Sequence, residues 1–239
     1  MTGLFDADLR QAAALSKRLR PPVPVLPLAR LIRRNQLLIE AASPRAVETL
    51  LPKVIARKKA LLLLSVGGLL RNPALLRRAV ARKIRLYVPS GALAGLDGIK
   101  AAAIGRLRSV TLTTRKHPRA LAGAPGLKRR GIRLYGLRRA KTIFEGSAAQ
   151  AAAGFPQNIN VAATLALAGL GGRRTHVRIV ADPAARVNTH EVEAVGSFGR
   201  LFVRTENRPA PGNPKTSQLA IQSALAALNR ILQPVQIGS

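Results

Sequence analysis

Several residue types are missing or scarce in this chain of 239 residues, which has no cysteine, no tryptophan, one methionine and 3% aromatic residues. Without cysteine there can be no disulfide, no thiolate nucleophile and no zinc or iron–sulfur site built on cysteine ligands. The three histidines, His117, His176 and His190, are far apart, and we therefore expect no metal site. Because GxSxG, Walker A and HExxH motifs are also absent, hydrolase and phosphoryl-transfer chemistry are not favoured.

Long hydrophobic runs are lacking as well. Apolar runs such as residues 60–64 are far too short to cross a bilayer. The first residues, MTGLFDADLR, do not have the basic start and apolar stretch of a signal peptide. We therefore expect no membrane span. A chain free of cysteine also fits a reducing compartment, and the expected location is the cytoplasm.

Acidic residues are few, with 10 Asp and Glu against 40 Lys and Arg, and the formal net charge is +30. Residues 1–150 hold 31 of the basic residues and 6 of the acidic ones. A field of this sign attracts nucleic acid, anionic membranes or phosphorylated ligands. The scarcity of aromatics and the spread of the cations along several helices argue against dedicated nucleic-acid binding. Solvated helix faces are the favoured interpretation, and binding of nucleic acid or another polyanion is the alternative.

The first part of the chain alternates between apolar runs and amphipathic stretches. We expect strands at 36–41, 60–65 and 84–88, and helices at 43–58 and 74–83 between them. The run at 61–64 is apolar without alternation, as is typical of a parallel strand covered on both faces. This pattern predicts an α/β fold with a doubly wound, Rossmann-like parallel sheet.

The glycine fingerprint GxGxxG of a Rossmann dinucleotide site does not occur near the start of the sequence. The segment Leu4-Phe5-Asp6 is typical of the last residues of a strand. If this strand is the second of the sheet, Asp6 occupies the position of a carboxylate that binds ribose, and the Rossmann domain is expected to be N-terminally truncated. By itself, Asp6 is better explained as a helix cap.

The second part predicts longer alternating strands, at 109–115, 142–145, 174–181, 187–195 and 199–206, interrupted by helices at 148–154 and 158–170. Such a pattern favours an α+β domain with a largely antiparallel sheet. We expect a loop of weak structure at 123–136, a rigid linker at 208–214 and a closing helix at 217–232. The resulting division is a partial Rossmann domain (1–94), a catalytic and oligomerisation domain (95–213) and a C-terminal helix packed on the first domain (214–239).

His190 is the best titratable candidate, because an imidazole exchanges protons near neutral pH. It alternates in phase with Val192 and Ala194, so a structural histidine at the edge of the core is the competing interpretation. Asp182 could orient it, although a plain turn is favoured.

Other polar residues stand at helix starts. Asn158 and Asn160 open one helix, where each could cap it or offer its amide to a ligand. Lys215 and Thr216 precede the closing helix and could bind a substrate carboxylate, although an ordinary helix start explains them equally.

A set of motifs covers nearly the whole chain in order, and the SGALAGLD loop and the NINVAAT helix start are its most specific members. The motifs are IEAASPRAVE (39–48), LLSVGGL (63–69), YVPSGALAGLDGIKAA (87–102), VTLTTRKHP (110–118), FEGSA (144–148), FPQNINVAATLALAG (155–169), VRIVADPAARVNTHEVE (177–193) and ENRPAPGNPKTS (206–217). Together they resemble the L-aspartate dehydrogenase family. One departure is His117, which stands where the family usually has proline.

The resemblance implies NAD(P)-dependent oxidation of L-aspartate to iminosuccinate, which hydrolyses to oxaloacetate and ammonia or feeds nicotinamide cofactor synthesis. It further implies a homo-oligomer formed through the second domain. His190 would be the catalytic histidine. The residues that would contact the cofactor are Ala92, Asn160, Ala42, Ser43, Leu64 and Ser65, with Asp6 at the ribose. The sequence leaves open NAD against NADP, another small amino or hydroxy acid as substrate, and an impaired scaffold that binds a polyanion.

Overall fold

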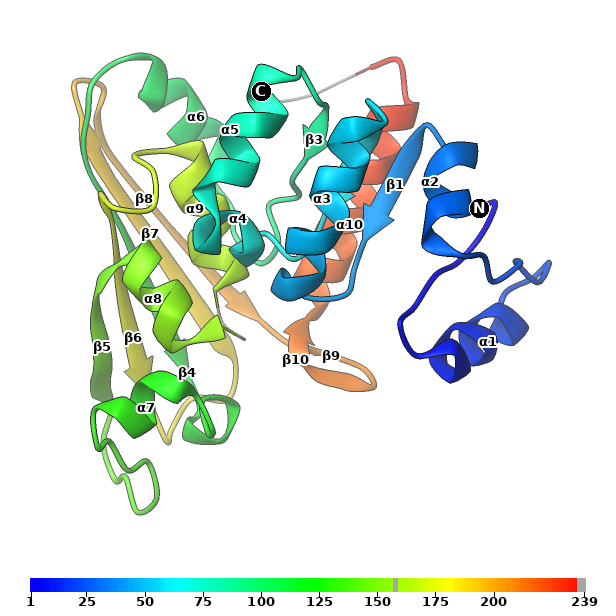
Figure 1. Ribbon diagram of the computed structural model, residues 1–239. Coiled ribbons are helices and arrows are strands. Elements are labelled where there is room, and N and C mark those ends of the chain that lie inside the picture. Colours follow the sequence, from blue (N-terminus) through cyan, green and yellow to red (C-terminus); the bar gives the residue numbers. More distant parts are fainter. Residues whose placement is uncertain (157–158, 236–239) are drawn as a thin grey trace.

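The computed structural model of the chain describes residues 1–156 and 159–235, apart from the side chains of Pro214 and Lys215. Two sheets stand side by side in it, a parallel one from the first part of the chain and a larger one from the second (Figure 1). Each sheet has its own apolar core. The expected class, a Rossmann-like parallel sheet followed by an α+β part, is confirmed.

The parallel sheet has the order β1-β2-β3, with strands β1 (Leu37–Glu40), β2 (Ala60–Leu63) and β3 (Leu86–Tyr87). Helix α3 (Pro44–Ala56) joins the first two strands, and α5 (Pro73–Ala81) precedes the third. The Ser43 side chain caps α3 by accepting from the Ala46 N–H at 3.1 Å. Leu61, Leu62 and Leu63 of β2 are buried, as expected of a strand covered on both faces.

A helix that the sequence pattern did not predict, α4 (Gly67–Arg71), follows β2 and packs against α3, α5, α8 and α9. Its glycines permit this close packing. A Cβ at Gly67 would lie 2.4 Å from Ile159 Cγ2, and one at Gly68 would lie 2.8 Å from the Pro44 carbonyl oxygen. Five residues with two glycines carry too little periodicity to indicate a helix, so the packing of neighbours decides the structure here.

The first residues form α1 (Leu9–Arg18) and α2 (Leu28–Arg34). The strand expected to end at Asp6 is reduced to a single parallel bridge between Leu4 and Val25. Within the described residues, β1 is an outer strand of its sheet, and Ile39 on it is 52% exposed.

The larger sheet has the order β5-β6-β4-β7-β8, and only the β4–β6 pair is parallel. The expectation of a largely antiparallel sheet is therefore confirmed. The strands are β4 (Leu107–Lys116), β5 (Lys141–Ser147), β6 (Thr175–Ala181), β7 (Asn188–Gly196) and β8 (Gly199–Asn207).

Three helices lie on the side of this sheet that faces the parallel sheet (Figure 1): α6 (Leu96–Ile104), α8 (Ala148–Gly154) and α9 (Asn160–Ala168). Apolar residues alternate onto this covered side, including Val110, Leu112, Val192 and Ala194. The other side carries ion pairs such as Arg178–Glu145 at 2.9 Å.

The loop expected at 123–136 contains regular structure. The stretch 123–136 includes α7 (Pro125–Arg129), in which Leu127 is buried, and a short 3-10 helix, η1 (Pro118–Ala120), precedes it. His117 caps that 3-10 helix through Nδ1, which accepts from the Arg119 N–H at 3.2 Å.

The expected rigid linker at 208–214 was a wrong prediction. It begins a hairpin of β9 (Pro209–Ala210) and β10 (Asn213–Ser217), because Gly212, with φ +75°, allows the tight turn. Lys215 and Thr216 therefore belong to a strand, and Ser217 caps α10 (Gln218–Leu232). Helix α10 runs back beside the parallel sheet (Figure 1).

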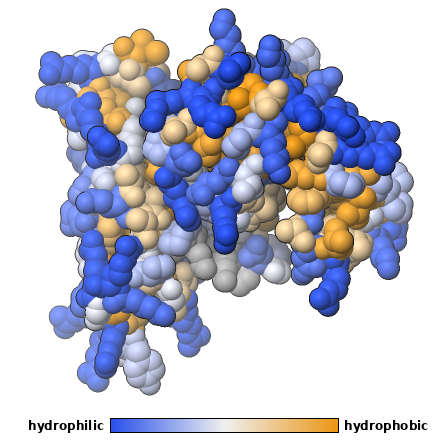
Figure 2. Space-filling model, viewed as in Figure 1, coloured by the Kyte–Doolittle hydropathy of each residue, from blue (hydrophilic) through white to orange (hydrophobic). Residues whose placement is uncertain are grey.

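Hydrophilic residues are distributed over the whole visible face of the molecule and do not form one band (Figure 2). This distribution agrees with the interpretation of the cations as solvated helix faces. Among the helices of residues 1–156 and 159–235, none combines the length and the apolar character needed to cross a bilayer.

Candidate active site

A row of polar side chains crosses the covered side of the larger sheet at the end of β4. The strand register places Thr114 opposite His190, and His190 opposite Thr205. Directly opposite residues share a face, so the three side chains project together. His190 is 3% exposed, and its Nδ1 lies 3.1 Å from Thr114 Oγ1. The row is thus a buried, hydrogen-bonded constellation at the end of an otherwise apolar face.

A second row follows one step further along the strands. Lys116 lies two residues beyond Thr114, Asn188 two before His190, and Asn207 two beyond Thr205. Since side chains alternate along a strand, these three share the face of the first row. Lys116 is 9% exposed and Asn207 is 2% exposed. The two rows bring an imidazole, an ammonium group and a carboxamide to one buried place.

Burial controls the charge state of the two titratable groups. It is the main reason why the pKa of His190 is lowered to about 3, with the positive charge of Lys116 as a second cause. Burial likewise lowers the pKa of Lys116 to about 8. At pH 7 the site therefore contains a neutral imidazole next to a protonated lysine.

The loop that carries Ala92 is fastened to these rows. The Ala92 carbonyl accepts hydrogen bonds from Thr205 Oγ1 at 2.9 Å and from Asn207 Nδ2 at 3.2 Å. Gly91 and Gly95, with φ +66° and +76°, give the loop its course. Since Thr205 pairs with His190, the Ala92 loop is bonded to the strand next to that of His190.

Asn160 links the two halves of the molecule. It is the first residue of α9, and its side-chain oxygen accepts from the Gly67 N–H at 3.0 Å and does not cap its own helix. The bond joins α9 to the loop that contains Leu64 and Ser65. Asn158, the other asparagine of the motif, lies outside the described residues.

The four residues expected along the dinucleotide are organised by Glu40, at the carboxyl end of β1. Its Oε1 accepts from the N–H groups of Ala42 at 2.8 Å and Ser43 at 3.1 Å, and its Oε2 accepts from Ser65 at 2.9 Å. The Leu64 N–H donates to the Glu40 carbonyl at 3.0 Å. Glu40 is 3% exposed. A single buried carboxylate therefore ties the two strand-end loops together.

Other expected site residues lie elsewhere. Asp6 is exposed and accepts from the Asp8 N–H at 2.8 Å, the bond of a local turn. Asp182 does not orient His190; it pairs with Arg115 at 2.9 Å and accepts from the Ala184 N–H, as a turn residue would. Thr216 is half-buried at the end of β10, and the side chain of Lys215 lies outside the described part of the chain.

Sequence reasoning did not single out Glu40, Lys116, Asn207, Thr114 or Thr205. Two of them could have been recognised from the sequence pattern. Glu40 is a charged residue at the end of an apolar parallel strand, and Lys116 alternates in phase with Val110 and Leu112, where an apolar residue is expected. Asn207 and the two threonines could not have been recognised in this way, because polar residues are common at strand ends.

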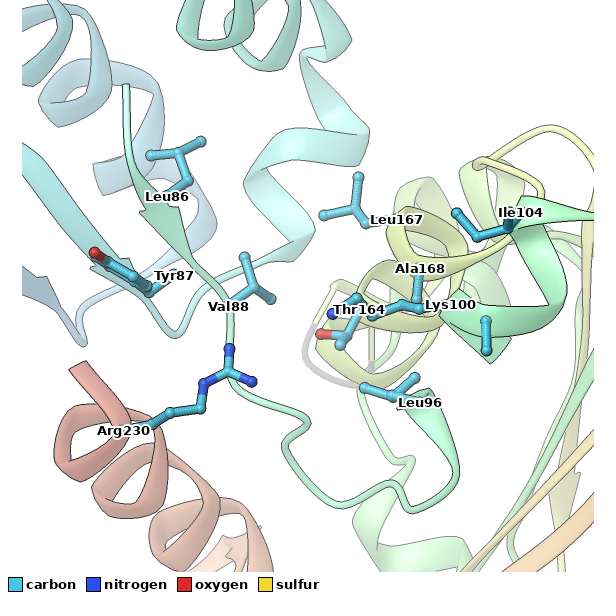
Figure 3. Close-up of a pocket in the computed structure, with 11 residues that line it drawn as sticks. Leu86, Tyr87, Val88, Leu96, Lys100, Ile104, Thr164, Leu167, Ala168 and Arg230 are labelled. Atoms are coloured by element: carbon cyan, nitrogen blue, oxygen red, sulfur yellow. The ribbon is translucent and has the colours of Figure 1, made fainter. Parts of the chain in front are cut away.

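Two open cavities of about 530 and 540 Å³ lie near this site, and the second is lined in part by the Ala92 loop, at Ser90 and Leu93. The first is bounded by Val88 after β3, Arg230 of α10, and Thr164 and Leu167 of α9 (Figure 3). Neither cavity is lined by His190 or Asn160. In the described part of the chain, no three His, Asp or Glu side chains are grouped as metal ligands.

Comparison with known families decides between the interpretations. Residues 97–231 match the model of the C-terminal domain of aspartate dehydrogenase, which is more than half of the chain. The chain belongs to the aspartate dehydrogenase family. Residues 1–89 match the NAD-binding domain of homoserine dehydrogenase, which supports an NAD(P) cofactor for this family member.

Similar proteins agree with this assignment. An L-aspartate dehydrogenase of Methanosarcina barkeri is 46% identical over 87% of this chain and 78% of its own length. One of Methanosarcina mazei is 43% identical over 99% of this chain and 89% of its own. The crystal structure of aspartate dehydrogenase from Thermotoga maritima, 24% identical, has the same fold, with a TM-score of 0.74 over 100% of this chain and 99% of that one. The polyanion-binding alternative gains no support from these matches.

The role of Glu40 in this dehydrogenase fold is testable with two substitutions. Glu40→Gln keeps one carboxyl-like oxygen and should lower the free energy of unfolding by about 1–3 kcal/mol, since one N–H loses its acceptor. Glu40→Ala removes all three bonds and should cost more. Denaturant unfolding measures both. Glu48→Gln, which breaks the solvent-accessible pair between Glu48 of α3 and Arg71 of α4, is the matched control and should change stability by less than about 1 kcal/mol. Equal effects at both positions would contradict the assignment.

Lys116 should destabilise the free protein at neutral pH. Its pKa falls from 10.5 to about 8 on folding, so the penalty is full below pH 8 and vanishes above pH 10.5. Lys116→Met should therefore raise the free energy of unfolding at pH 7 by up to about 3 kcal/mol. The exposed Lys100→Met serves as the control and should leave it unchanged. A destabilised Lys116→Met variant would refute this account.

His190 should make the fold sensitive to acid. Its pKa falls from 6.5 in the unfolded chain to about 3 in the folded one, so only the unfolded state gains this proton as the pH drops below 6.5. Between pH 7 and pH 4 the wild type should lose about 3 kcal/mol more stability than His190→Gln. His117→Gln, altered outside the buried rows, should follow the wild type. Unfolding titrations at both pH values decide the matter.

Proposed function

We propose that this chain catalyses the NAD(P)-dependent oxidation of L-aspartate to iminosuccinate, which hydrolyses to oxaloacetate and ammonia and can feed nicotinamide cofactor biosynthesis. The observation that carries the proposal is that the Ala92 loop is hydrogen-bonded to Thr205, which pairs with His190, in a chain of this family. The bond from Asn160 to Gly67 supports it by joining the helix of the NIN motif to the strand-end loop of the parallel sheet. The similar proteins named above carry the same activity in their names.

The cofactor would lie along the carboxyl ends of the parallel strands, where ligands bind in open α/β sheets. Ala42, Ser43, Leu64 and Ser65 form the two loops there, and Ala92 and Asn160 face the nicotinamide end. The residues present fit such a group at that end: Ala42, Ser43 and Ser65 have small side chains, and a Cβ at Gly91 would meet nothing within 4 Å. We keep Asp6 as the proposed ribose contact.

The charge states of the site indicate which step the cofactor performs and which step the protein performs. When bound, the nicotinamide supplies the hydride acceptor for the substrate's α-carbon. The amino group must lose a proton before its lone pair can form the C=N bond as the hydride leaves. With Nδ1–H donating to Thr114, the neutral His190 presents Nε2 as the proton acceptor. The balance is L-aspartate and NAD(P)⁺ giving iminosuccinate, NAD(P)H and one proton.

Lys215 and Thr216 remain our proposed contacts for a substrate carboxylate. Their place next to Ser217, which caps α10, puts them where backbone N–H groups begin a helix. Functionally, we propose residues 1–94 as the cofactor domain, 95–213 as the catalytic and oligomerisation domain, and 214–239 as a helix returning to the first.

We also propose a cytoplasmic homo-oligomer. The uncovered side of the larger sheet offers a self-complementary pattern, with pairs such as Arg204–Glu191 beside Phe202, which is 56% exposed. A C₂ axis through this side would let each copy present the same surface.

The test is NAD(P)H formation with L-aspartate, measured by absorbance for each cofactor. His190→Ala should lower kcat/KM by roughly 100-fold to 10,000-fold, since it removes the proton acceptor. His117→Ala is the control and should keep activity.

A panel of other amino and hydroxy acids, run in the same assay, excludes a different substrate. Absence of aspartate-dependent reduction, together with tight and salt-sensitive DNA or RNA binding, would favour the polyanion-binding alternative.

A further inference from the structure

The second polar row contains a cation that the proposed chemistry above does not use. Lys116 is buried on the same face as Thr114 and His190, close enough for its charge to lower the pKa of His190. An ammonium group binds a ligand carboxylate through charge-assisted hydrogen bonds, and this one is held at a fixed place by the strand. Lys116 ends β4, two residues beyond Thr114, the partner of His190 in the sheet.

The same row contains a buried acceptor. Asn207 Nδ2 donates to the Ala92 carbonyl and to Thr205 Oγ1, at 3.2 and 3.1 Å. Because a carbonyl only accepts, this fixes the amide orientation and leaves Oδ1 as the remaining acceptor. Asn207 Oδ1 is buried and has no hydrogen-bond partner within the described structure. A buried acceptor of this kind calls for a donor from a ligand or a water molecule.

The spacing of these groups suits a small zwitterion. Lys116 and Asn207 stand two strands apart, which is about 10 Å between backbones. His190 projects from the strand between them, one step back along the sheet.

We propose that Lys116 and Asn207 form the subsite for the substrate's amino-acid group: the Lys116 ammonium binds the α-carboxylate, and Asn207 Oδ1 accepts a hydrogen bond from the amino group. The α-carbon then lies beside His190 and below the loop of Ala92. Lys215 and Thr216 are left for the side-chain carboxylate. This inference deepens the proposed function and rests on it for the identity of the substrate.

The test of Lys116 uses substitutions that separate binding from chemistry. Lys116→Met should raise the KM of L-aspartate at least about 30-fold, because an ion pair in a buried site is lost. The KM of NAD(P) should stay within about threefold. Lys116→Arg keeps the charge and should recover part of the loss. Lys100→Met removes an exposed lysine and is the control. A fall in kcat with an unchanged KM for aspartate, not relieved by arginine, would show a proton-transfer role and overturn the proposal.

Asn207 is tested by changing the ligand as well as the protein. Calorimetry with NADH present compares L-aspartate with succinate, which lacks the amino group. The wild type should prefer aspartate, and Asn207→Ala should reduce this preference at least fivefold. General damage to the Ala92 loop would weaken the binding of both ligands alike, so it cancels in this ratio. An unchanged preference would overturn the role of Asn207.

The same calorimetry separates the inference from the proposed function. If the wild type forms NAD(P)H from aspartate but Lys116→Met binds aspartate and succinate as the wild type does, the function stands and the inference fails. If the wild type shows no such activity, the function fails. In that case, weaker binding of succinate to Lys116→Met than to the wild type still supports a carboxylate subsite at Lys116. If the wild type binds no succinate at all, the inference is overturned.

Discussion

The register between β4, β7 and β8 determines which side chains meet at the active site. Thr114, His190 and Thr205 share one row only because the three strands pair without a shift over this stretch. A slip of one residue would turn His190 to the uncovered, ion-paired side of the sheet. The register is held by Val110, Leu112, Val192 and Ala194, which need the cover of the helices. The apolar core of the second sheet thus positions the polar groups at its end.

The cofactor side depends on a different interaction, the buried carboxylate of Glu40. Three backbone N–H groups, from two loops that are 22 residues or more apart in sequence, converge on it. Helix α4 then continues from the second of these loops, and the bond from Gly67 to Asn160 carries the connection into the catalytic part. Glu40, α4 and Asn160 therefore form one chain of contacts from the parallel sheet to the site. A change at either end should be felt at the other, because the glycines of α4 leave no room for adjustment.

Much of this arrangement could be predicted from local pattern. The alternation of the second part placed all five strands of the larger sheet, and Ser43 followed by Pro44 indicated the start of α3. His190 was found because its residue type suits proton transfer. Local pattern failed where distant neighbours decide the outcome: α4 forms because α3 and α9 enclose it, and the hairpin of β9 and β10 replaced an expected linker. Asn160 was expected to cap its helix or to contact a ligand, and only the fold reveals its bond to Gly67. Lys116 and Asn207 were missed for the same reason, because their significance lies in the row they share across strands.

The second polar row also shows why such residues escape a search for stabilising interactions. An apolar side chain at position 116 would continue the alternation of Val110 and Leu112 and would remove a poorly solvated charge. Asn207 satisfies its amide hydrogens but leaves its oxygen without a partner in the described structure. Both positions depart from what folding alone favours, and they do so next to the one buried imidazole of the described residues. Sites that bind charged ligands are where such departures from the optimum for folding are expected.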